Sequence, residues 1–232
     1  MKTGWWRPAV TLRRISCLRD YHRGHRYVLS NQKWYRVDDT YLRRVDARLR
    51  AVPGCAQPAI LPWPRILRDG KLVHHEEDYN RQYLQKSDFL VLDRKPFAKF
   101  GRAHGRSKVE IADLFHLRTK KLFCVKRWNG SSTMSHLLAQ ASVSAQLLRM
   151  LPAYANELVR QVQRRWPSRS APANAEDFLQ GVSFVYVIGT KHRPKDCSLD
   201  MLPVFTKVNM AKHLDRLQGA HFTAEICWTQ ML

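Results

Sequence analysis

Two charged residues, Asp113 and Lys126, each interrupt an apolar segment of the kind that forms a β-strand. Residues 109–117 (VEIADLFHL) and 122–126 (LFCVK) fit two neighbouring strands, and alternate side chains of a strand share a face. Asp113 then lies on an apolar face, and a two-residue turn at residues 119–120 sets it opposite Lys126. Because a buried charge is costly unless it is paired or bound to a metal ion, the two residues form either a structural ion pair or a functional site.

Polar side chains in the flanking segments are able to complete a site around this pair. The preceding segment opens with Glu76 and Glu77, whose acidic side chains suit the start of a helix. The following segment, residues 131–151, has apolar residues at helical spacing, with His136 and Gln140 four residues apart on one face. Both helices are expected to bring polar groups toward the charged pair.

The expected order of elements across residues 76–228 is helix, three strands, helix, strand, helix and strand. This order predicts an α/β fold in which a mixed β-sheet is flanked by helices. Residues 1–70 are expected to form a small basic accessory region at the N-terminus, with a β-hairpin at 27–35 and a helix at 38–52. Residues 71–232 then form the main α/β domain.

The order of elements over residues 76–188, with Asp113 and Lys126 on neighbouring strands, resembles the PD-(D/E)XK nuclease superfamily. The restriction-endonuclease-like core of that superfamily is helix, three strands, helix, strand (αβββαβ). Asp113 matches the Asp of the second strand, and Lys126 matches the Lys of the Glu-x-Lys motif on the third. The resemblance implies that carboxylates hold Mg²⁺ against the scissile phosphate, while the Lys orients the attacking water or steadies negative charge. It therefore implies that the main domain is nuclease-like.

Cys124 stands where the superfamily has the Glu of its motif, and a single Asp is a poor cage for a hard cation. A second carboxylate has to come from Glu76, Glu77 or Glu110. Strand alternation turns Glu110 away from Asp113, so Glu77 on the preceding helix is the favoured ligand. The resulting candidate catalytic residues are Asp113, Lys126, Glu77 and Gln140, with Asp113 and Glu77 as the ligands of Mg²⁺.

The sequence gives less support to a cysteine nucleophile, to disulfide bonds or to a zinc site. Cys124 with His136 as its base would make a nucleophilic pair, but a cysteine inside an apolar strand is usually a small buried hydrophobe, which we favour. The five cysteines are never closer than 30 residues apart, and no histidine stands in a His-Glu-x-x-His context. Neither a disulfide framework nor a zinc site is predicted.

The sequence is strongly basic. Lys and Arg number 40 against 19 acidic residues, for a net charge of +21, and residues 1–75 alone carry 16 basic and 5 acidic side chains. This excess attracts a polyanion through counterion release, so nucleic acid is the expected partner. A composition that only keeps the chain soluble is the alternative. The candidate nucleic-acid-binding residues are Arg102, Arg106, Lys108, Arg127, Ser131 and Ser132, the last two at a helix N-terminus whose N–H groups bind phosphate.

The sequence has no feature of an exported or membrane-bound protein. No apolar run approaches the roughly 20 residues of a membrane span, and the N-terminus MKTGWWRPAVTLRR lacks the apolar stretch of a signal peptide. With an odd number of widely spaced cysteines, a cytoplasmic location and no membrane partner are expected.

A finer resemblance runs over residues 27–228. The string from Val125 to Gln140 (VKRWNGSSTMSHLLAQ), together with SKVEIADLF and LPVFTKVN, is similar to a bacterial family of unknown function that is sporadically distributed and associated with mobile elements and phage-defence genes. Members of that family are often much longer. The resemblance therefore implies that this chain is the C-terminal part, lacking an N-terminal half or depending on a protein partner.

Three functions are compatible with these observations. A nuclease-like enzyme of a bacterial defence or toxin system would use Asp113, Lys126 and a helper carboxylate on Mg²⁺. A noncatalytic nucleic-acid-binding module that kept the scaffold and lost the metal would account for Cys124. An interaction subunit would present its basic face to an acidic partner protein. The positions of the glutamates relative to Asp113 separate the first function from the second.

Overall fold

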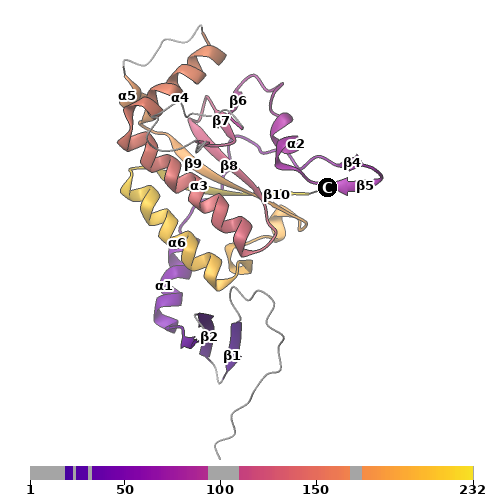
Figure 1. Cartoon of the computed structure of the whole chain (residues 1–232), viewed down its shortest axis with the longest axis vertical. Helices are drawn as coiled ribbons and strands as arrows, with labels where there is room; N and C mark the ends of the chain where they lie inside the picture. The colour runs from indigo at the N-terminus through magenta and orange to yellow at the C-terminus, as the bar shows by residue number, and fades with distance from the viewer. Residues whose placement is uncertain (1–18, 23–24, 31–32, 94–109, 168–173, 232) are drawn as a thin grey trace, which may run out of the picture. The chain divides into compact units, whose positions relative to one another are not determined.

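In the computed structural model, the chain forms two compact units, Met1–Arg44 and Val45–Leu232 (Figure 1). This division comes earlier in the chain than the boundary at residue 70 that the sequence suggests. The segment before residue 70 joins the larger unit in part because Trp63 forms a β-bridge to Met231. The structure describes residues 19–22, 25–30, 33–93, 110–167 and 174–231.

The N-terminal unit contains a three-stranded antiparallel sheet in the order β1-β2-β3. The strands are β1 (Arg19–His22), β2 (His25–Ser30) and β3 (Lys33–Arg36). The hairpin predicted at residues 27–35 corresponds to β2 and β3 and is confirmed. Strand β1 is an addition that the sequence pattern did not indicate.

Helix α1 (Asp39–Arg50) begins at the end of the N-terminal unit and continues into the second unit. The backbone N–H of Tyr41 donates to Oδ1 of Asp38 at 2.6 Å, so Asp38 caps the first turn. The helix ends before Pro53, which cannot continue a helix. The prediction of a helix over residues 38–52 is confirmed to within two residues.

A mixed five-stranded sheet in the order β10-β9-β8-β7-β6 forms the centre of the second unit (Figure 1). Strands β6, β7 and β8 pair antiparallel, whereas β8, β9 and β10 run parallel. The predicted α/β fold with a mixed sheet is thereby confirmed. The strands are β6 (Phe89–Val91), β7 (Leu114–His116), β8 (Lys121–Arg127), β9 (Ser183–Thr190) and β10 (Thr223–Gln230).

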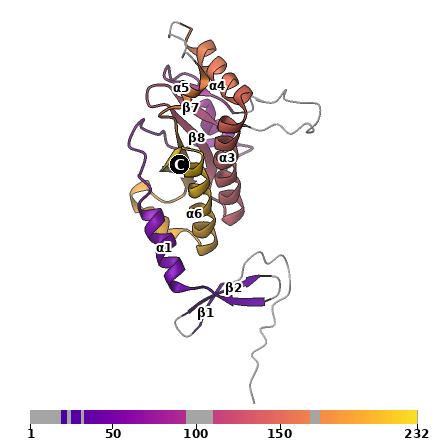
Figure 2. The same ribbon diagram turned by 90° about the vertical axis from the view of Figure 1, so that its left-hand side faces the viewer.

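Helices flank this sheet. Helices α3 and α6 lie side by side and share one core with the sheet (Figure 2), while α2 packs with Trp63 against the other face. Among the described residues, no helix is long and apolar enough to cross a membrane. The helices are α2 (Glu76–Arg81), α3 (Ser131–Met150), α4 (Pro152–Arg165), α5 (Ala175–Leu179) and α6 (Val204–Gly219), and a hairpin of β4 (Ile66–Arg68) and β5 (Lys71–Val73) precedes α2.

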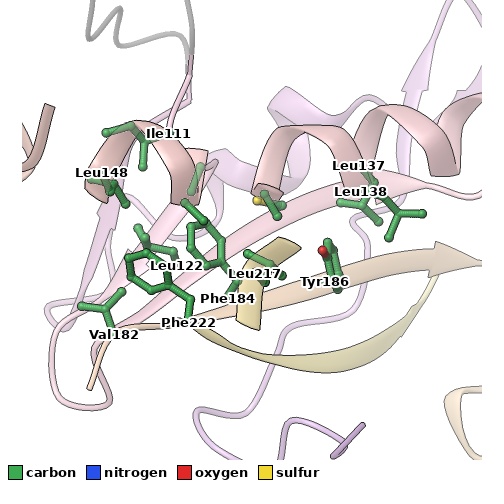
Figure 3. Close-up of a cluster of buried hydrophobic side chains, with 14 of the residues drawn as sticks. Ile111, Leu122, Leu137, Leu138, Leu148, Val182, Phe184, Tyr186, Leu217 and Phe222 are labelled. Carbon is green, nitrogen blue, oxygen red and sulfur yellow. The ribbon is translucent and has the colours of Figure 1, made fainter. Parts of the chain in front are cut away.

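Alternate residues of the central strands supply two cores, one on each face of the sheet. Leu122 and Phe184 point toward α3 and pack in the same cluster as Leu138 (Figure 3). Their neighbours Phe123 and Val185 point the other way, into the cluster that contains Trp63 and the aromatic side chains around α2. Every residue of β9 is buried, which is typical of a central parallel strand. Packing on both faces therefore holds the strand ends, where the polar residues gather, in fixed positions.

Gly189 of β9 has no room for a side chain, because the ring of Trp63 covers it. A Cβ atom at Gly189 would lie 2.4 Å from Cζ3 of Trp63, and Trp63 is fully buried in a close-packed core. We therefore expect Gly189→Ala to lower the free energy of unfolding, measured in urea, by about 1–3 kcal/mol. Gly219→Ala, whose Cβ atom meets nothing within 4 Å, should change it by less than about 0.5 kcal/mol. Equal losses in the two variants would contradict this explanation.

Candidate metal and nucleic-acid site

A pocket of about 740 Å³, here called the acidic pocket, is lined by residues of α2, α3 and the ends of β6, β7 and β8. All four candidate catalytic residues line it, so the structure brings together side chains that lie up to 63 positions apart, from Glu77 to Gln140. Five of its lining side chains are carboxylates. Its polar lining residues include Glu76, Glu77, Asp93, Glu110, Asp113, Lys126, His136 and Gln140.

Three of these carboxylates are close enough to share one cation. Asp93 follows β6, Asp113 immediately precedes β7 and Glu110 lies just before it in the chain. One carboxylate oxygen from each residue lies within 4.8 Å of the others. Oxygens bound to a single Mg²⁺ or Ca²⁺ ion at about 2.0–2.6 Å cannot be more than about 5 Å apart, so the spacing fits one hard divalent cation.

Asp113 is the buried member of this triad. Its Oδ2 accepts a 2.7 Å hydrogen bond from the backbone N–H of Val125 in β8, which fixes the carboxylate against the sheet. Burial raises the pKa of Asp113 from 3.8 to about 7; the hydrogen bond from Val125 opposes the rise, and the negative charges of Asp93, Glu110 and Glu76 add to it. A bound cation would favour the ionised form and offset this cost.

Asn80 of α2 contacts two members of the triad. Its side chain is almost completely buried, and Nδ2 lies 3.2 Å from Oδ2 of Asp93 and 3.5 Å from Oδ1 of Asp113. Its Oδ1 is buried and has no hydrogen-bond partner in the described part of the chain. Rotation of the amide by half a turn would present this oxygen to the triad, and an amide oxygen is a suitable ligand for a hard cation.

Lys126 lies in the same pocket but does not pair with Asp113, so the predicted ion pair is wrong. The turn between β7 and β8 has four residues, Leu117–Lys120, and it sets Leu114 opposite Phe123. This register differs by two residues from the one that a two-residue turn would give. Nζ of Lys126 donates instead to Oε2 of Glu76 at 2.6 Å.

The predicted direction of the Glu110 side chain is also wrong. Strand alternation predicted that its side chain would point away from Asp113, yet the regular strand begins only at Leu114. Residues 110–113 are irregular, so the period of two does not apply to them. Glu110 therefore reaches the same side as Asp113.

Glu77 and Gln140 line the acidic pocket without belonging to the triad. The carboxylate of Glu77 pairs with Arg81 one turn later in α2. Gln140 lies on α3 beside Ala139, one turn after His136. A metal role for Glu77 stays a prediction.

Cys124 is a buried core residue, as favoured from the sequence. Its side chain lies in the cluster that contains Tyr186 and Leu138, on the face that packs against α3. Burial raises the pKa of the Cys124 thiol well above its usual value, and the negative charge of Asp113 adds to the rise. A thiol held in its protonated form is a poor nucleophile, which argues against Cys124 as the reacting group.

The candidate nucleic-acid-binding residues fall in two places. Arg102, Arg106 and Lys108 lie outside the described residues. Arg127 ends β8, and Ser131 and Ser132 open α3 close by in the chain. Ser132 is exposed, whereas Oγ of Ser131 accepts a 3.3 Å hydrogen bond from the Thr206 hydroxyl of α6.

Sequence reasoning missed Asp93 and Asn80. Asp93 directly follows the apolar string FLVL, and an acid at the end of a buried strand is a recognisable signal. Asn80 stands four residues after Glu76 and therefore on the same side of the helix. Neither residue could be placed beside Asp113 without knowing where the sheet ends.

A model of one protein family, described as a family of unknown function (DUF6119), matches residues 13–230 of the chain. The match covers the first structural unit from residue 13 onward and the second unit as far as residue 230. No curated protein and no solved structure matches the chain.

Proposed function

The chain belongs to DUF6119, a family whose description names no activity, and from the site itself we propose that this protein is a metal-dependent phosphodiesterase acting on nucleic acid. One observation carries the proposal: the Asp93, Glu110 and Asp113 carboxylates converge to the spacing of one cation, in the pocket that Lys126 also lines. The net charge of +21 supports a polyanionic substrate. The resemblance to the PD-(D/E)XK superfamily supports the same reaction class.

The residues of the acidic pocket divide into three roles. Asp93, Glu110 and Asp113 would hold Mg²⁺ or Mn²⁺, which supplies Lewis-acid activation of the phosphate and a more acidic bound water. Lys126, held in place by Glu76, would contact a phosphate oxygen and steady its negative charge. Lys126 is thus positioned by Glu76 of α2 instead of by Asp113.

Asn80 has a positioning role in this proposal. Its buried amide bridges the Asp93 and Asp113 carboxylates, which would otherwise repel each other. A bound cation would itself reduce the repulsion between the carboxylates, so the hydrogen bonds from the Asn80 amide would not be required. The amide could then rotate so that its unpartnered Oδ1 faces the ion.

A noncatalytic nucleic-acid-binding module is the second candidate, favoured by Cys124 at the position of the superfamily's metal-binding Glu. The two candidates differ in whether Glu110 and Asp93 replace that lost ligand. For either, the sequence resemblance implies a setting in bacterial defence or a toxin system.

The cleavage test compares the native chain with Glu110→Gln and Glu77→Gln on labelled single- and double-stranded DNA and RNA, with Mg²⁺, Mn²⁺ or EDTA. We expect cleavage by the native chain that requires the metal and falls about 100-fold or more in Glu110→Gln, equivalent to roughly 3 kcal/mol of transition-state stabilisation. Glu77→Gln, which alters an acid of the same pocket that pairs with Arg81, should stay within a few-fold.

The opposite pattern, with activity lost only in Glu77→Gln, would assign the metal to Glu77 as the sequence suggested. Absence of cleavage on all four substrates, with salt-sensitive binding intact, would favour the binding module. Binding that does not depend on salt would contradict both candidates.

A further inference from the structure

A second pocket of about 560 Å³, here called the basic pocket, lies where β8 and β9 end and α3 begins. The residues that give it chemical character are His74, Arg127, Trp128, Gly130, Lys191 and His192. Four of these six residues carry or can accept a positive charge, and none of the residues that line the pocket is acidic. Its character is therefore opposite to that of the acidic pocket.

The two fixed charges of the basic pocket, on Arg127 and Lys191, have no ion-pair partner among the described residues. Neither Arg127 nor Lys191 forms an ion pair with an acid in the described part of the chain. Both lie close enough to His74 to lower its pKa, an effect added to the larger one of burial. Like charges held together without a counter-charge repel one another, and an anion in the pocket would relieve that repulsion.

One ring nitrogen of His74, Nδ1, also lacks a hydrogen-bond partner. This atom is buried, yet no group in the described residues donates to it or accepts from it. A buried polar atom without a partner costs free energy, so such atoms are usually satisfied by a ligand or by water. His74 thus offers the pocket a hydrogen-bonding group that the protein itself does not use.

The N-terminus of α3 adds a partial positive charge beside the same pocket. Gly130 is the N-cap of this 20-residue helix, no side chain caps it, and the first turn contains no acid. The hydroxyl of Thr133 is already engaged, since it accepts from the Asn129 N–H and donates to the Gly130 carbonyl. The helix N-terminus therefore has no side-chain cap, and its N-cap residue Gly130 lines the pocket.

Consecutive residues of the chain line the acidic pocket and the basic pocket. Lys126 lines the acidic pocket and Arg127 lines the basic one; likewise His75 lines the acidic pocket and His74 the basic one. A nucleic-acid backbone carries phosphates at short, regular intervals, so a strand whose scissile phosphate lies in the acidic pocket has to place another phosphate nearby.

We propose that the basic pocket binds a phosphate of the nucleic-acid strand, with Arg127 and Lys191 as its counter-charges, His74 as a hydrogen-bonding group and the start of α3 beneath it. The partly buried Trp128 offers a ring against which the adjoining base can stack. The proposal rests on the proposed function for its substrate class, but it concerns binding and does not require a metal ion or catalysis.

The test measures fluorescence anisotropy in EDTA, where no metal-dependent cleavage occurs, with 10-nucleotide single-stranded DNA labelled at the 3′ end and carrying either a 5′-phosphate or a 5′-hydroxyl. We expect Arg127→Gln and Lys191→Gln each to weaken binding about tenfold and to reduce the slope of log K against log salt by about one. Lys195→Gln, which removes the same charge from an exposed position four residues after Lys191 and outside the pocket, should weaken binding less than twofold.

The two oligonucleotides distinguish binding of a terminal phosphate from binding of an internal phosphate. Loss of a preference for the 5′-phosphorylated strand in Lys191→Gln assigns the pocket to a terminal phosphate, and equal weakening of both strands assigns it to an internal one. Either result supports the proposal, provided that thermal unfolding shows both variants folded. Binding by Arg127→Gln and Lys191→Gln that equals that of Lys195→Gln would overturn it. Because these measurements exclude metal, failure of the cleavage test would leave their outcome unaffected.

Discussion

Replacing Asp113 with Asn should stabilise the metal-free protein at pH 8 and, at the same time, remove its response to divalent cations. The pKa of Asp113 is raised to about 7, so at pH 8 the native chain holds an ionised carboxylate in a buried site beside Asp93 and Glu110. Asn removes that charge while its Oδ1 can still accept from the Val125 N–H. We expect a gain of about 2–4 kcal/mol in the free energy of unfolding, from about 1.4 kcal/mol per pKa unit.

The sign of this effect depends on pH. Between about pH 4 and pH 7 the folded protein keeps the proton of Asp113 that the unfolded chain has already lost. The stability contributed by that proton is fully present below pH 4 and is lost as the pH rises to 7. Native and Asp113→Asn should therefore be similar in stability near pH 4 and diverge up to about pH 7, as measured by urea denaturation in EDTA.

Divalent cations supply the second readout. Mn²⁺ at 1 mM should raise the melting temperature of the native chain at pH 8, because an ion that binds only the folded state stabilises it, and it should leave Asp113→Asn unchanged. Below pH 7 the effect of Mn²⁺ on the native chain should weaken, since the ion has to displace the proton of Asp113.

Asp78→Asn is the matched control. Asp78 is also a buried aspartate of this region, but both of its carboxylate oxygens accept hydrogen bonds from Arg68 at 2.9 and 3.0 Å. Neutralising it should lower stability by about 1 kcal/mol or more, because a paired charge is lost. Destabilisation by Asp113→Asn similar to that by Asp78→Asn would show that Asp113 is a structural residue instead of part of a strained metal site.

Replacing Cys124 with Glu should cost several kcal/mol of stability without increasing metal binding or cleavage. The superfamily resemblance makes this the substitution that would restore a missing ligand. In the structure, however, Cys124 is completely buried in an apolar cluster, and the acidic triad is already complete without it. A carboxylate at that position is desolvated and lies near the charge of Asp113, so we expect a loss of about 3–5 kcal/mol.

Cys124→Ala is the control for this change, because it removes the thiol without adding a charge. Its loss should be near 1 kcal/mol, from a small cavity. Thermal unfolding, Mn²⁺ titration and cleavage of the four substrates would be measured for both variants in parallel. An increase in Mn²⁺ affinity or in cleavage by Cys124→Glu would indicate that the native site is degenerate and that the Asp93–Glu110–Asp113 triad does not hold the ion.

Local sequence patterns were sufficient for most of the secondary structure. Helix α3 follows from apolar residues spaced three and four apart between Met134 and Leu148, and it is confirmed from Ser131 to Met150. Strand β9 follows from the unbroken apolar string at 184–188. These elements were predictable because their periodicity is a property of neighbouring residues. The apolar side of each element then packs against the core.

The arrangement of the site was decided by tertiary structure. Asp93 and Glu110 belong to the triad because β6, which Asp93 follows, pairs antiparallel with β7, which Glu110 precedes, and no local pattern reports this pairing. The partner of Lys126 changed from Asp113 to Glu76 because a four-residue turn sets the β7–β8 register. A turn that differs by two residues preserves the face of every side chain but moves its opposite neighbour.

The sequence by itself therefore determined which residues are polar within apolar strands, the strong positive charge and the order of most helices and strands of the main domain. Only the tertiary structure decided which carboxylates lie close enough to share a metal ion, which basic residue each acid pairs with, and which residues line the acidic and basic pockets. The physical reason is that chemistry of a site depends on distances of a few ångströms between residues far apart in the chain, and those distances are set by register and packing.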